Sequence, residues 1–157
     1  MKKKKPVEIF CDGSYDTKNK VGGYATIMLF GDKIKKYSSR SYSETSIARM
    51  EMKGIIFGLE TVKPGFDIFI YSDHKMIVDS INKWLDGWIK DDRMIKRANV
   101  DLWRRFVKIR DKHIEGGSDM LFSWIRSHTG HKYNEMADHY AVKARRKKNP
   151  LICKREN

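Results

Sequence analysis

A first β-strand is predicted from the sequence Val7-Glu8-Ile9-Phe10-Cys11, which is apolar and β-favouring on both of its faces. Asp12-Gly13 follows directly and predicts that this strand ends in a turn. A second stretch of the same kind, Phe66-Asp67-Ile68-Phe69-Ile70-Tyr71, ends at Ser72-Asp73. Because helical segments separate the two stretches along the chain, we expect them to pair in parallel.

The segments between these stretches predict an antiparallel meander and a helix. Strands are expected at residues 24–30, between Gly22-Gly23 and Gly31-Asp32, and at residues 34–42. From Ile47 onward apolar residues recur at helical spacing until Pro64-Gly65, which predicts a helix.

The second half of the chain predicts two helices, a strand and a final helix. Helical spacing begins at Met76 and returns at residues 100–113, and residues 84–98 between them are expected to be irregular. Residues 120–125 predict the last strand, and Asn134 is a candidate N-cap for a helix that extends toward Arg145-Arg146. The expected order is βββαβααβα, an α/β fold with a five-stranded mixed sheet whose first three strands are antiparallel and whose later strands are parallel.

Size and charge limit the classes of function. A chain of 157 residues is typical of one domain, and 33 Lys and Arg against 20 Asp and Glu leave a net charge of +13. This charge predicts a polyanionic partner, with nucleic acid first and an anionic membrane as the alternative. The apolar run Tyr24–Phe30 is too short to span a membrane, and Glu8 interrupts any signal peptide. Cys11 and Cys153 have no disulfide or metal-binding spacing, so we expect reduced thiols and a cytoplasmic protein.

Four acidic residues stand out in this basic chain. Asp12 and Asp73 follow predicted parallel strands, at the sheet edge where ligand sites of α/β proteins lie. Glu51 lies at the edge of the buried face of the first helix, and Asp138 lies in the last helix. Taken singly, each has an ordinary explanation as a turn residue, a helix cap or a surface residue. We hypothesise that the four side chains converge in one crevice, and this convergence would indicate a functional site in place of four unrelated surface residues.

The chain resembles type 1 ribonuclease H over residues 7–145. The resemblance rests on a set of motifs that occur in order and at the expected spacing: Asp12-Gly13-Ser14, Gly22-Gly23-Tyr24, Arg49-Met50-Glu51, Ser72-Asp73, Asn99-Val100-Asp101-Leu102-Trp103, and the segment 128–138 with His128, Gly130, His131, Asn134, Glu135 and Asp138. It implies a ribonuclease H-like fold and endonucleolytic cutting of the RNA strand of RNA–DNA hybrids, with 5′-phosphate and 3′-hydroxyl products.

The same resemblance implies a metal site. Clustered carboxylates repel one another unless a cation neutralises them, and ligands that are all oxygen favour Mg²⁺ or Mn²⁺ over Zn²⁺. Two Mg²⁺ ions about 3.5 to 4 Å apart would hold the scissile phosphodiester. Asp12, Glu51, Asp73 and Asp138 are the implied metal ligands and catalytic residues. His128 is the implied catalytic histidine for proton transfer or product release. Zinc binding by His128 and His131 is a weaker alternative, since no cysteine lies near them in sequence.

Substrate binding is expected at two places. A basic protrusion, residues 83–97, interleaves cations with tryptophans that could pack on sugars or bases, although both tryptophans could instead belong to the core. The candidate substrate-binding residues are Gly13, Ser14, Lys18, Ser46, Arg49, Lys75, Lys83, Trp84, Trp88, Lys90, Arg93, Lys96 and Asn134. Ser46 corresponds to a family threonine that holds a DNA-strand phosphate.

The residues expected to contact substrate depart from the family pattern at three places. In the family, amide side chains at these places contact the minor groove of the nucleic acid. Lys18 replaces an asparagine, Ile47-Ala48 replaces an Asn-Asn pair, and Lys75 replaces a glutamine. We hypothesise that Lys18 and Lys75 exchange amide readout for phosphate attraction.

We expect residues 1–6 and 146–157 to be basic tails around one domain at residues 7–145, and the protein to act as a monomer without a membrane partner. A junction resolvase or integrase on a similar sheet, and a non-catalytic nucleic-acid binder, remain as alternatives.

Overall fold

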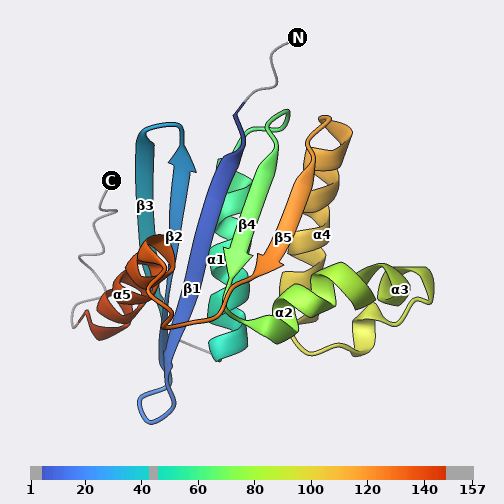
Figure 1. The fold of residues 1–157 in the computed structure, drawn as a ribbon. Coiled ribbons are helices and arrows are strands. Elements are labelled where there is room, and N and C mark those ends of the chain that lie inside the picture. The colour runs from blue at the N-terminus through green and yellow to red at the C-terminus, as the bar shows by residue number, and fades with distance from the viewer. Residues whose placement is uncertain (1–4, 43–45, 148–157) are drawn as a thin grey trace.

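The computed structural model describes residues 5–42 and 46–147 (Figure 1). A five-stranded sheet has the spatial order β3-β2-β1-β4-β5. Its strands are β1 (Val7–Asp16), β2 (Val21–Phe30), β3 (Lys33–Ser41), β4 (Ile68–Ser72) and β5 (Met120–Trp124). Strand β2 is antiparallel to both β1 and β3, whereas β1, β4 and β5 are parallel. The predicted mixed sheet is confirmed.

The helices follow the predicted order. They are α1 (Ile47–Thr61), α2 (Lys75–Asp79), α3 (Leu85–Lys90), α4 (Val100–Glu115) and α5 (Lys132–Arg146), with a π-helical turn at Ser80–Trp84 and a 3₁₀ turn at Met94–Lys96. The π-helical turn joins α2 to α3, so residues 75–90 form one continuous helical segment. Counted this way, the order is βββαβααβα. No helix in the described part of the chain is long and apolar enough to cross a membrane.

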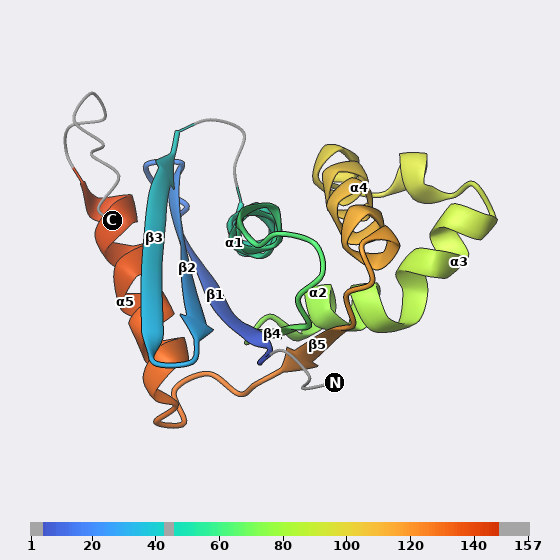
Figure 2. The same cartoon turned by 90° about the horizontal axis from the view of Figure 1, so that it is seen from above.

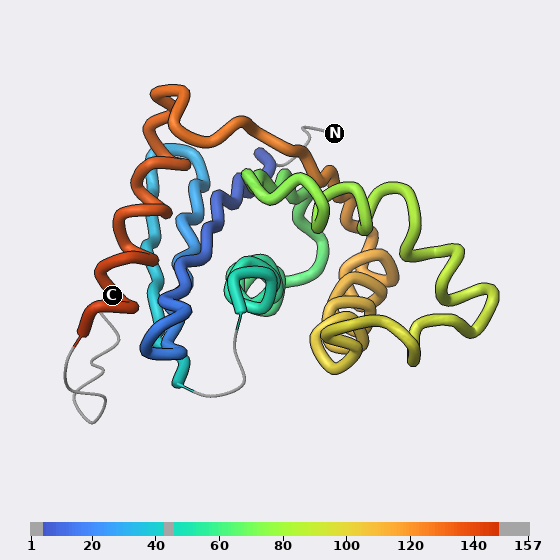
Figure 3. The backbone as a smooth tube through the Cα atoms, turned by 90° about the horizontal axis from the view of Figure 1, so that it is seen from below, coloured from blue at the N-terminus to red at the C-terminus, as the bar shows by residue number. Residues whose placement is uncertain are grey.

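Helices cover both faces of the sheet. Figures 2 and 3 show α1 on one face of the strands and α5 on the other, with α4 beside α1. The larger core lies on the α1 side, where Ile9 and Ile70 of the sheet meet Ile55 of α1 and Phe106 of α4. A smaller core, which includes Phe10, Ile27 and Ala137, lies under α5. The central strand β1 is therefore buried on both faces, as its sequence predicts.

Two glycines bring α1 close to the sheet. A Cβ atom at Gly58 would lie 2.9 Å from Cγ2 of Ile9, so a larger side chain would push the helix away from β1. One turn earlier, the Thr26 hydroxyl of β2 donates a 2.7 Å hydrogen bond to the Gly54 carbonyl. At the start of the helix, Ser46 caps α1 by accepting a 3.2 Å hydrogen bond from the Arg49 amide. This packing places the first turns of α1, which carry Glu51, beside β1.

The first strand is longer than predicted. It does not end at Asp12-Gly13 but continues to Asp16, because β2 remains paired with it as far as the Val21↔Asp16 pair. The parallel pairing of β1 with β4, however, ends at Cys11↔Ser72. Asp12 therefore lies inside β1, at the position where its neighbour β4 has ended.

Two further predictions at the level of elements were wrong. Residues 84–98 are not wholly irregular, because buried Leu85 and Trp88 anchor α3 to the core. Asn134 is not the N-cap of the last helix: α5 begins at Lys132 with His131 at the cap position, and Asn134 is buried inside the helix. The predicted extension of α5 into Arg145-Arg146 is confirmed. Of the two predicted tails, residues 1–4 and 148–157 lie outside the described residues.

Candidate active site

Three carboxylates gather beside the end of β4. Asp12, Glu51 and Asp73 each offer one oxygen atom, and these three atoms lie within 4.8 Å of one another. Asp12 and Glu51 are buried, with 4% and 3% of their surfaces exposed, and Asp73 is partly buried. None of the ion pairs between described residues involves any of the three. The cluster is thus a concentration of acidic groups that form no ion pair with any described cation.

Three different elements supply these side chains. Asp12 lies in β1, Glu51 in the second turn of α1, and Asp73 directly after β4. Gly13 makes the close approach of α1 possible, because a Cβ atom there would lie 2.7 Å from the Glu51 amide nitrogen. The Gly13 amide also donates a 2.8 Å hydrogen bond to Oδ1 of Asp12, which fixes the direction of the carboxylate. The Asp12-Gly13 pair therefore serves the site and not a strand-ending turn.

The surroundings of Asp12 favour its protonated form. Burial raises the pKa of Asp12 from its ordinary value of 3.8 to about 7, and the nearby charges of Asp73 and Asp138 act in the same direction. Hydrogen bonds from Glu51 and from the Gly13 amide act in the opposite direction and are outweighed. Near neutral pH the metal-free cluster therefore holds protons that a cation would displace.

The other two carboxylates respond in the same way. Burial raises the pKa of Glu51 well above its ordinary range, with the Asp12 charge as the next cause. Burial also raises the pKa of Asp73, and the charge of Asp138 adds to this effect. Oε2 of Glu51 is buried without a hydrogen-bond partner. An orphaned carboxylate oxygen among other carboxylates is what an oxygen-liganded divalent cation would satisfy, so these residues fit Mg²⁺ or Mn²⁺.

Asp138 lies near the cluster but outside its innermost group. It is partly buried on α5, and its charge reaches Asp12 and Asp73, although its oxygens are not among the three atoms within 4.8 Å. Asn134, one turn earlier on α5, is 3% exposed, and its side chain hydrogen-bonds to Asp73. The last helix therefore supplies one further acid and one amide to the same region.

Sequence reasoning missed Trp124 at the end of β5. Its indole Nε1 donates a 3.1 Å hydrogen bond to the backbone carbonyl of Asp73, and it stands opposite Ser72 in the β4–β5 register. The neighbouring Ile125 amide donates to the Ser72 carbonyl at 3.0 Å. These bonds hold the backbone that carries Asp73. The only signal in the sequence is that a tryptophan ends the strand that pairs with β4.

The two loop histidines lie outside the carboxylate cluster. His128 is exposed, has a left-handed backbone conformation with φ of 55°, and makes no side-chain hydrogen bond to another described residue. His131 lies at the N-cap position of α5 without a capping hydrogen bond from its side chain, and its ring centroid lies 4.9 Å from that of Phe10. Among the described residues, neither histidine belongs to a group of three or more candidate metal ligands. The zinc alternative gains no support from this arrangement.

Arg49 and Ser14, both predicted to bind substrate, contact side chains of other elements. Arg49 forms a bidentate ion pair with Asp101 at 2.9 and 2.7 Å, which ties α1 to the start of α4. Ser14 accepts a 2.7 Å hydrogen bond from Nε of Arg145. The partner of Arg49 was already visible in the sequence, since Asp101 is part of one of the motifs.

The basic protrusion forms a shallow hollow. A cavity of about 450 Å³ is lined by Lys83, Trp84, Gly87, Trp88, Arg93 and Arg97. Trp84 is 46% exposed, whereas Trp88 is 7% exposed and packs edge-to-face on Trp103 of the core. The guanidinium of Arg97 lies 4.3 Å from the centroid of the Trp88 ring. Of the two expectations for Trp88, its burial agrees with the alternative that its indole belongs to the core and leaves little of the ring free to stack on substrate.

The remaining cations named from the sequence are on the surface. Lys83 pairs with Asp79 at 3.5 Å, Lys75 pairs with the same carboxylate at 3.1 Å, and Arg93 pairs with Asp91 at 3.1 Å. Lys18 is exposed in the turn between β1 and β2, and Lys90 and Lys96 are exposed on the protrusion.

Comparisons with known proteins identify similar chains. The RNase H family profile matches residues 4–146. A Campylobacter jejuni protein named Ribonuclease H is 34% identical over 143 residues, which cover 89% of this chain and 91% of that protein. The crystal structure of LC9-RNase H1, described as a type 1 RNase H with the type 2 active-site motif, has a TM-score of 0.75 at 22% identity and covers 90% of this chain and 72% of that one. LC11-RNase H1, solved in complex with RNA/DNA hybrid, has a TM-score of 0.63 at 17% identity and covers 88% and 96%.

Proposed function

The chain belongs to the ribonuclease H family and is a ribonuclease H, and we propose that it hydrolyses the RNA strand of RNA–DNA hybrids with the help of two divalent cations. The products would carry 5′-phosphate and 3′-hydroxyl ends. The observation that carries this proposal is the group of three carboxylate oxygens within 4.8 Å of one another. The structure of the similar protein LC11-RNase H1 with an RNA/DNA hybrid supports the choice of substrate.

Asp12, Glu51 and Asp73 would hold the cations, with Asp138 as a further ligand at the edge of the cluster. When bound, Mg²⁺ or Mn²⁺ would neutralise the carboxylates, activate the attacking water and stabilise the leaving 3′ oxygen. Gly13 and Asn134 orient the carboxylates of Asp12 and Asp73 through hydrogen bonds.

His128 is the proposed proton carrier. It is exposed on the loop that leads into α5, the helix that also bears Asp138. An imidazole ring can both accept and donate a proton through its nitrogen atoms, which suits transfer to the leaving group or release of the product. Its exposed position supports a role at the mouth of the site.

Substrate would be held by the exposed cations and aromatics near the site. Trp84, Lys83, Lys90, Arg93 and Lys96 offer phosphate contacts and one exposed ring on the protrusion. Lys18, Ser46 and Lys75 are proposed to contact phosphates in the groove, and Arg49 to keep α1 and α4 in place beside it. We further propose that the protein acts as a cytoplasmic monomer. Sedimentation of the purified chain would test the proposed monomeric state.

The experiment is a cleavage assay with substrate labelled on either strand. We expect the wild-type protein to cut the RNA strand of a hybrid with Mg²⁺ and to stop with EDTA. Asp12→Asn should lower the rate by about 10³-fold or more, within the range that positioned catalytic groups contribute. Asp32→Asn removes the same charge from an exposed turn between β2 and β3 and should retain full activity. Cleavage that persists in Asp12→Asn would overturn the proposal.

The same assay separates the alternatives. A junction resolvase or integrase would prefer a four-way junction or duplex DNA over the hybrid. A non-catalytic binder would retain every substrate without metal-dependent turnover.

A further inference from the structure

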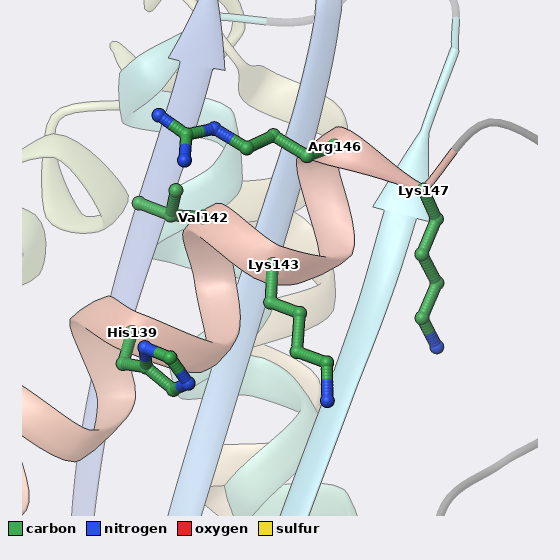
Figure 4. Close-up of a pocket in the computed structure, with 5 residues that line it drawn as sticks. All are labelled: His139, Val142, Lys143, Arg146 and Lys147. Atoms are coloured by element: carbon green, nitrogen blue, oxygen red, sulfur yellow. The ribbon is translucent and has the colours of Figure 1, made fainter.

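The outer surface of α5 carries a basic hollow that the proposed reaction does not use. A cavity of about 380 Å³ is lined by His139, Val142, Lys143, Arg146 and Lys147 (Figure 4). We call the four basic residues among these the outer basic face: His139, Lys143, Arg146 and Lys147. Lys36 of β3 adds a cation nearby, with its ammonium 5.5 Å from the centroid of the Tyr140 ring of α5.

The outer basic face points away from the carboxylate cluster. Ala137, Ala141 and Ala144 form the buried side of α5. At about 100° per residue, the centre of the outer basic face lies on the opposite side of the helix from these alanines, and Asp138 lies between the two sides. From His139 to Lys147 the face extends about 12 Å along the helix axis. It is therefore a separate surface, and α5 carries the proposed ligand Asp138 on another side.

No carboxylate of the described chain neutralises these cations. The hollow has no acidic lining residue, and Lys143, Arg146 and Lys147 take part in no ion pair between described residues. Arg105 and Arg110, by contrast, pair with Glu60 and Asp86, whereas other exposed lysines, among them Lys33, Lys35 and Lys63, also take part in no ion pair between described residues. The neighbouring Arg145 also has an acidic partner, Asp16, at 3.7 Å.

The helix dipole accounts for only part of this arrangement. Cations in the last turn of a helix interact favourably with its dipole, and Lys143, Arg145 and Arg146 all lie in that turn, whereas His139 lies earlier in the helix. Lys143 and Lys147 are separated by four residues and Lys143 and Arg146 by three, however, and like charges at these spacings destabilise a helix by about 0.2 to 0.5 kcal/mol per pair. A polyanion bound across the face would remove this repulsion.

We propose that the outer basic face is a second, non-catalytic binding surface for the phosphate backbone of double-stranded nucleic acid. Its length suits this ligand, because duplex DNA carries one charge per about 1.7 Å of axis and about seven charges therefore fall along 12 Å. Among the described residues, Val142 is the only apolar side chain that lines the hollow, too little for insertion into a lipid surface. The described lining residues likewise form no apolar floor that could bury the side chains of an acidic peptide.

The test is the salt dependence of duplex binding, measured with full-length protein in EDTA so that no cleavage is involved. A short DNA duplex is titrated with the wild type, with the triple variant Lys143→Gln, Arg146→Gln, Lys147→Gln, and with the matched triple variant Lys33→Gln, Lys35→Gln, Lys63→Gln. The matched lysines are exposed and line a different hollow on the α1 side of the sheet. Both variants therefore lose the same charge.

Each lost phosphate contact lowers the slope of log K against log salt by about 0.9. The α5 variant should therefore lose about 2 to 3 units of slope, and the matched variant less than about 1. Equal slopes in the two variants would mean that only the net charge matters and would overturn the proposal. This result stands apart from the proposed function, because the duplex binds without metal and without hydrolysis.

Two further measurements fix the site and the class of ligand. Amide chemical shifts of wild-type protein should change at residues 139–147 when duplex is added, and shifts confined to the carboxylate cluster and the protrusion would overturn the proposal. Poly-glutamate and vesicles of phosphatidylglycerol should compete poorly with the duplex. If either displaces it from the α5 surface at equal charge, the proposed occupant is wrong.

Discussion

The buried carboxyl of Asp12 makes the stability of the metal-free protein depend on pH. Its pKa rises from 3.8 to about 7 on folding. Below about pH 4 the group is protonated in both the folded and the unfolded chain, and it changes nothing. Between about pH 4 and 7 the unfolded chain loses the proton while the folded chain keeps it, so folding stability falls as pH rises. Above about pH 7 the full decrease in folding stability has occurred.

Asp12→Asn should therefore stabilise the metal-free protein at high pH. We expect a higher Tm than wild type by at least about 3 °C near pH 8, where about 1 kcal/mol corresponds to roughly 2–4 °C in a chain of this size. The difference should nearly vanish near pH 4. Thermal denaturation in EDTA measures both Tm values. A variant that is less stable than wild type near pH 8 would show that the surroundings of Asp12 do not destabilise its charged form.

Trp124 acts on the site through the backbone of Asp73. Trp124→Phe keeps most of the ring but removes the 3.1 Å hydrogen bond from Nε1 to the Asp73 carbonyl. A hydrogen bond contributes about 1 kcal/mol, so hybrid cleavage should slow by up to about fivefold and Tm should fall by no more than about 2–4 °C. Leu121→Ala on the same strand is the control, because Leu121 is 55% exposed. An unchanged rate in Trp124→Phe would show that Asp73 is held without this bond.

At the scale of residues, the sequence predicts which side chains have the chemistry for a functional site, but not which other residues those side chains contact. The proximity of Asp12, Glu51 and Asp73 could be predicted, because strand ends and a helix start converge at one edge of the sheet. The burial of Trp88 could not, because indole groups at helical spacing suit a core and a surface equally. The contact of Trp124 with Asp73 depends on the β4–β5 register, which no local pattern reveals.

At the scale of elements, the contact between α5 and β2 depends on Gly23. A Cβ atom there would lie 2.4 Å from the Ala141 carbonyl oxygen and 2.6 Å from the Arg145 amide nitrogen, and backbone atoms cannot move aside cheaply. Gly23→Ala should therefore push α5 away from the sheet and lower the free energy of unfolding by about 1–3 kcal/mol. Urea denaturation measures this change.

Gly87→Ala is the matched control for Gly23→Ala. Gly87 lies inside α3, and its nearest neighbour would be an arginine side-chain nitrogen at 3.8 Å, which is an ordinary contact. Alanine is favoured over glycine in a helix by about 1 kcal/mol, so this variant should be as stable as wild type or more stable. Similar losses in the two variants would contradict the close packing of α5 on β2.

The order of elements could be predicted from periodicity, but several of their ends could not. Strand β1 runs past Asp12-Gly13 because its antiparallel partner continues, and this partner is distant from the local turn signal. Helix α5 begins before Asn134 because the Asn134 side chain faces Asp73 and does not cap the helix. In both cases a residue of the candidate site does not follow the local turn or N-cap preference of its type, and tertiary contacts determine where the element begins or ends.

At the scale of the whole molecule, the net charge of +13 should appear in how substrate binding responds to salt. Lys18 and Lys75 replace the amides expected in the groove, and both are exposed. Lys18→Asn with Lys75→Gln should reduce the slope of log K against log salt for hybrid binding by about 2, at about 0.9 for each phosphate contact. Discrimination between hybrid and duplex DNA should improve. A wild-type salt response in this variant would rule out phosphate contacts by the two lysines.

The central claim is that acids from three separate elements form one cation site. Calorimetric titration of Mn²⁺ into metal-free protein, without substrate, tests it most directly. We predict saturable binding by the wild type and by Asp32→Asn, and loss of that binding in both Asp12→Asn and Glu51→Gln. Undiminished binding of Mn²⁺ by Asp12→Asn and Glu51→Gln would contradict the claim.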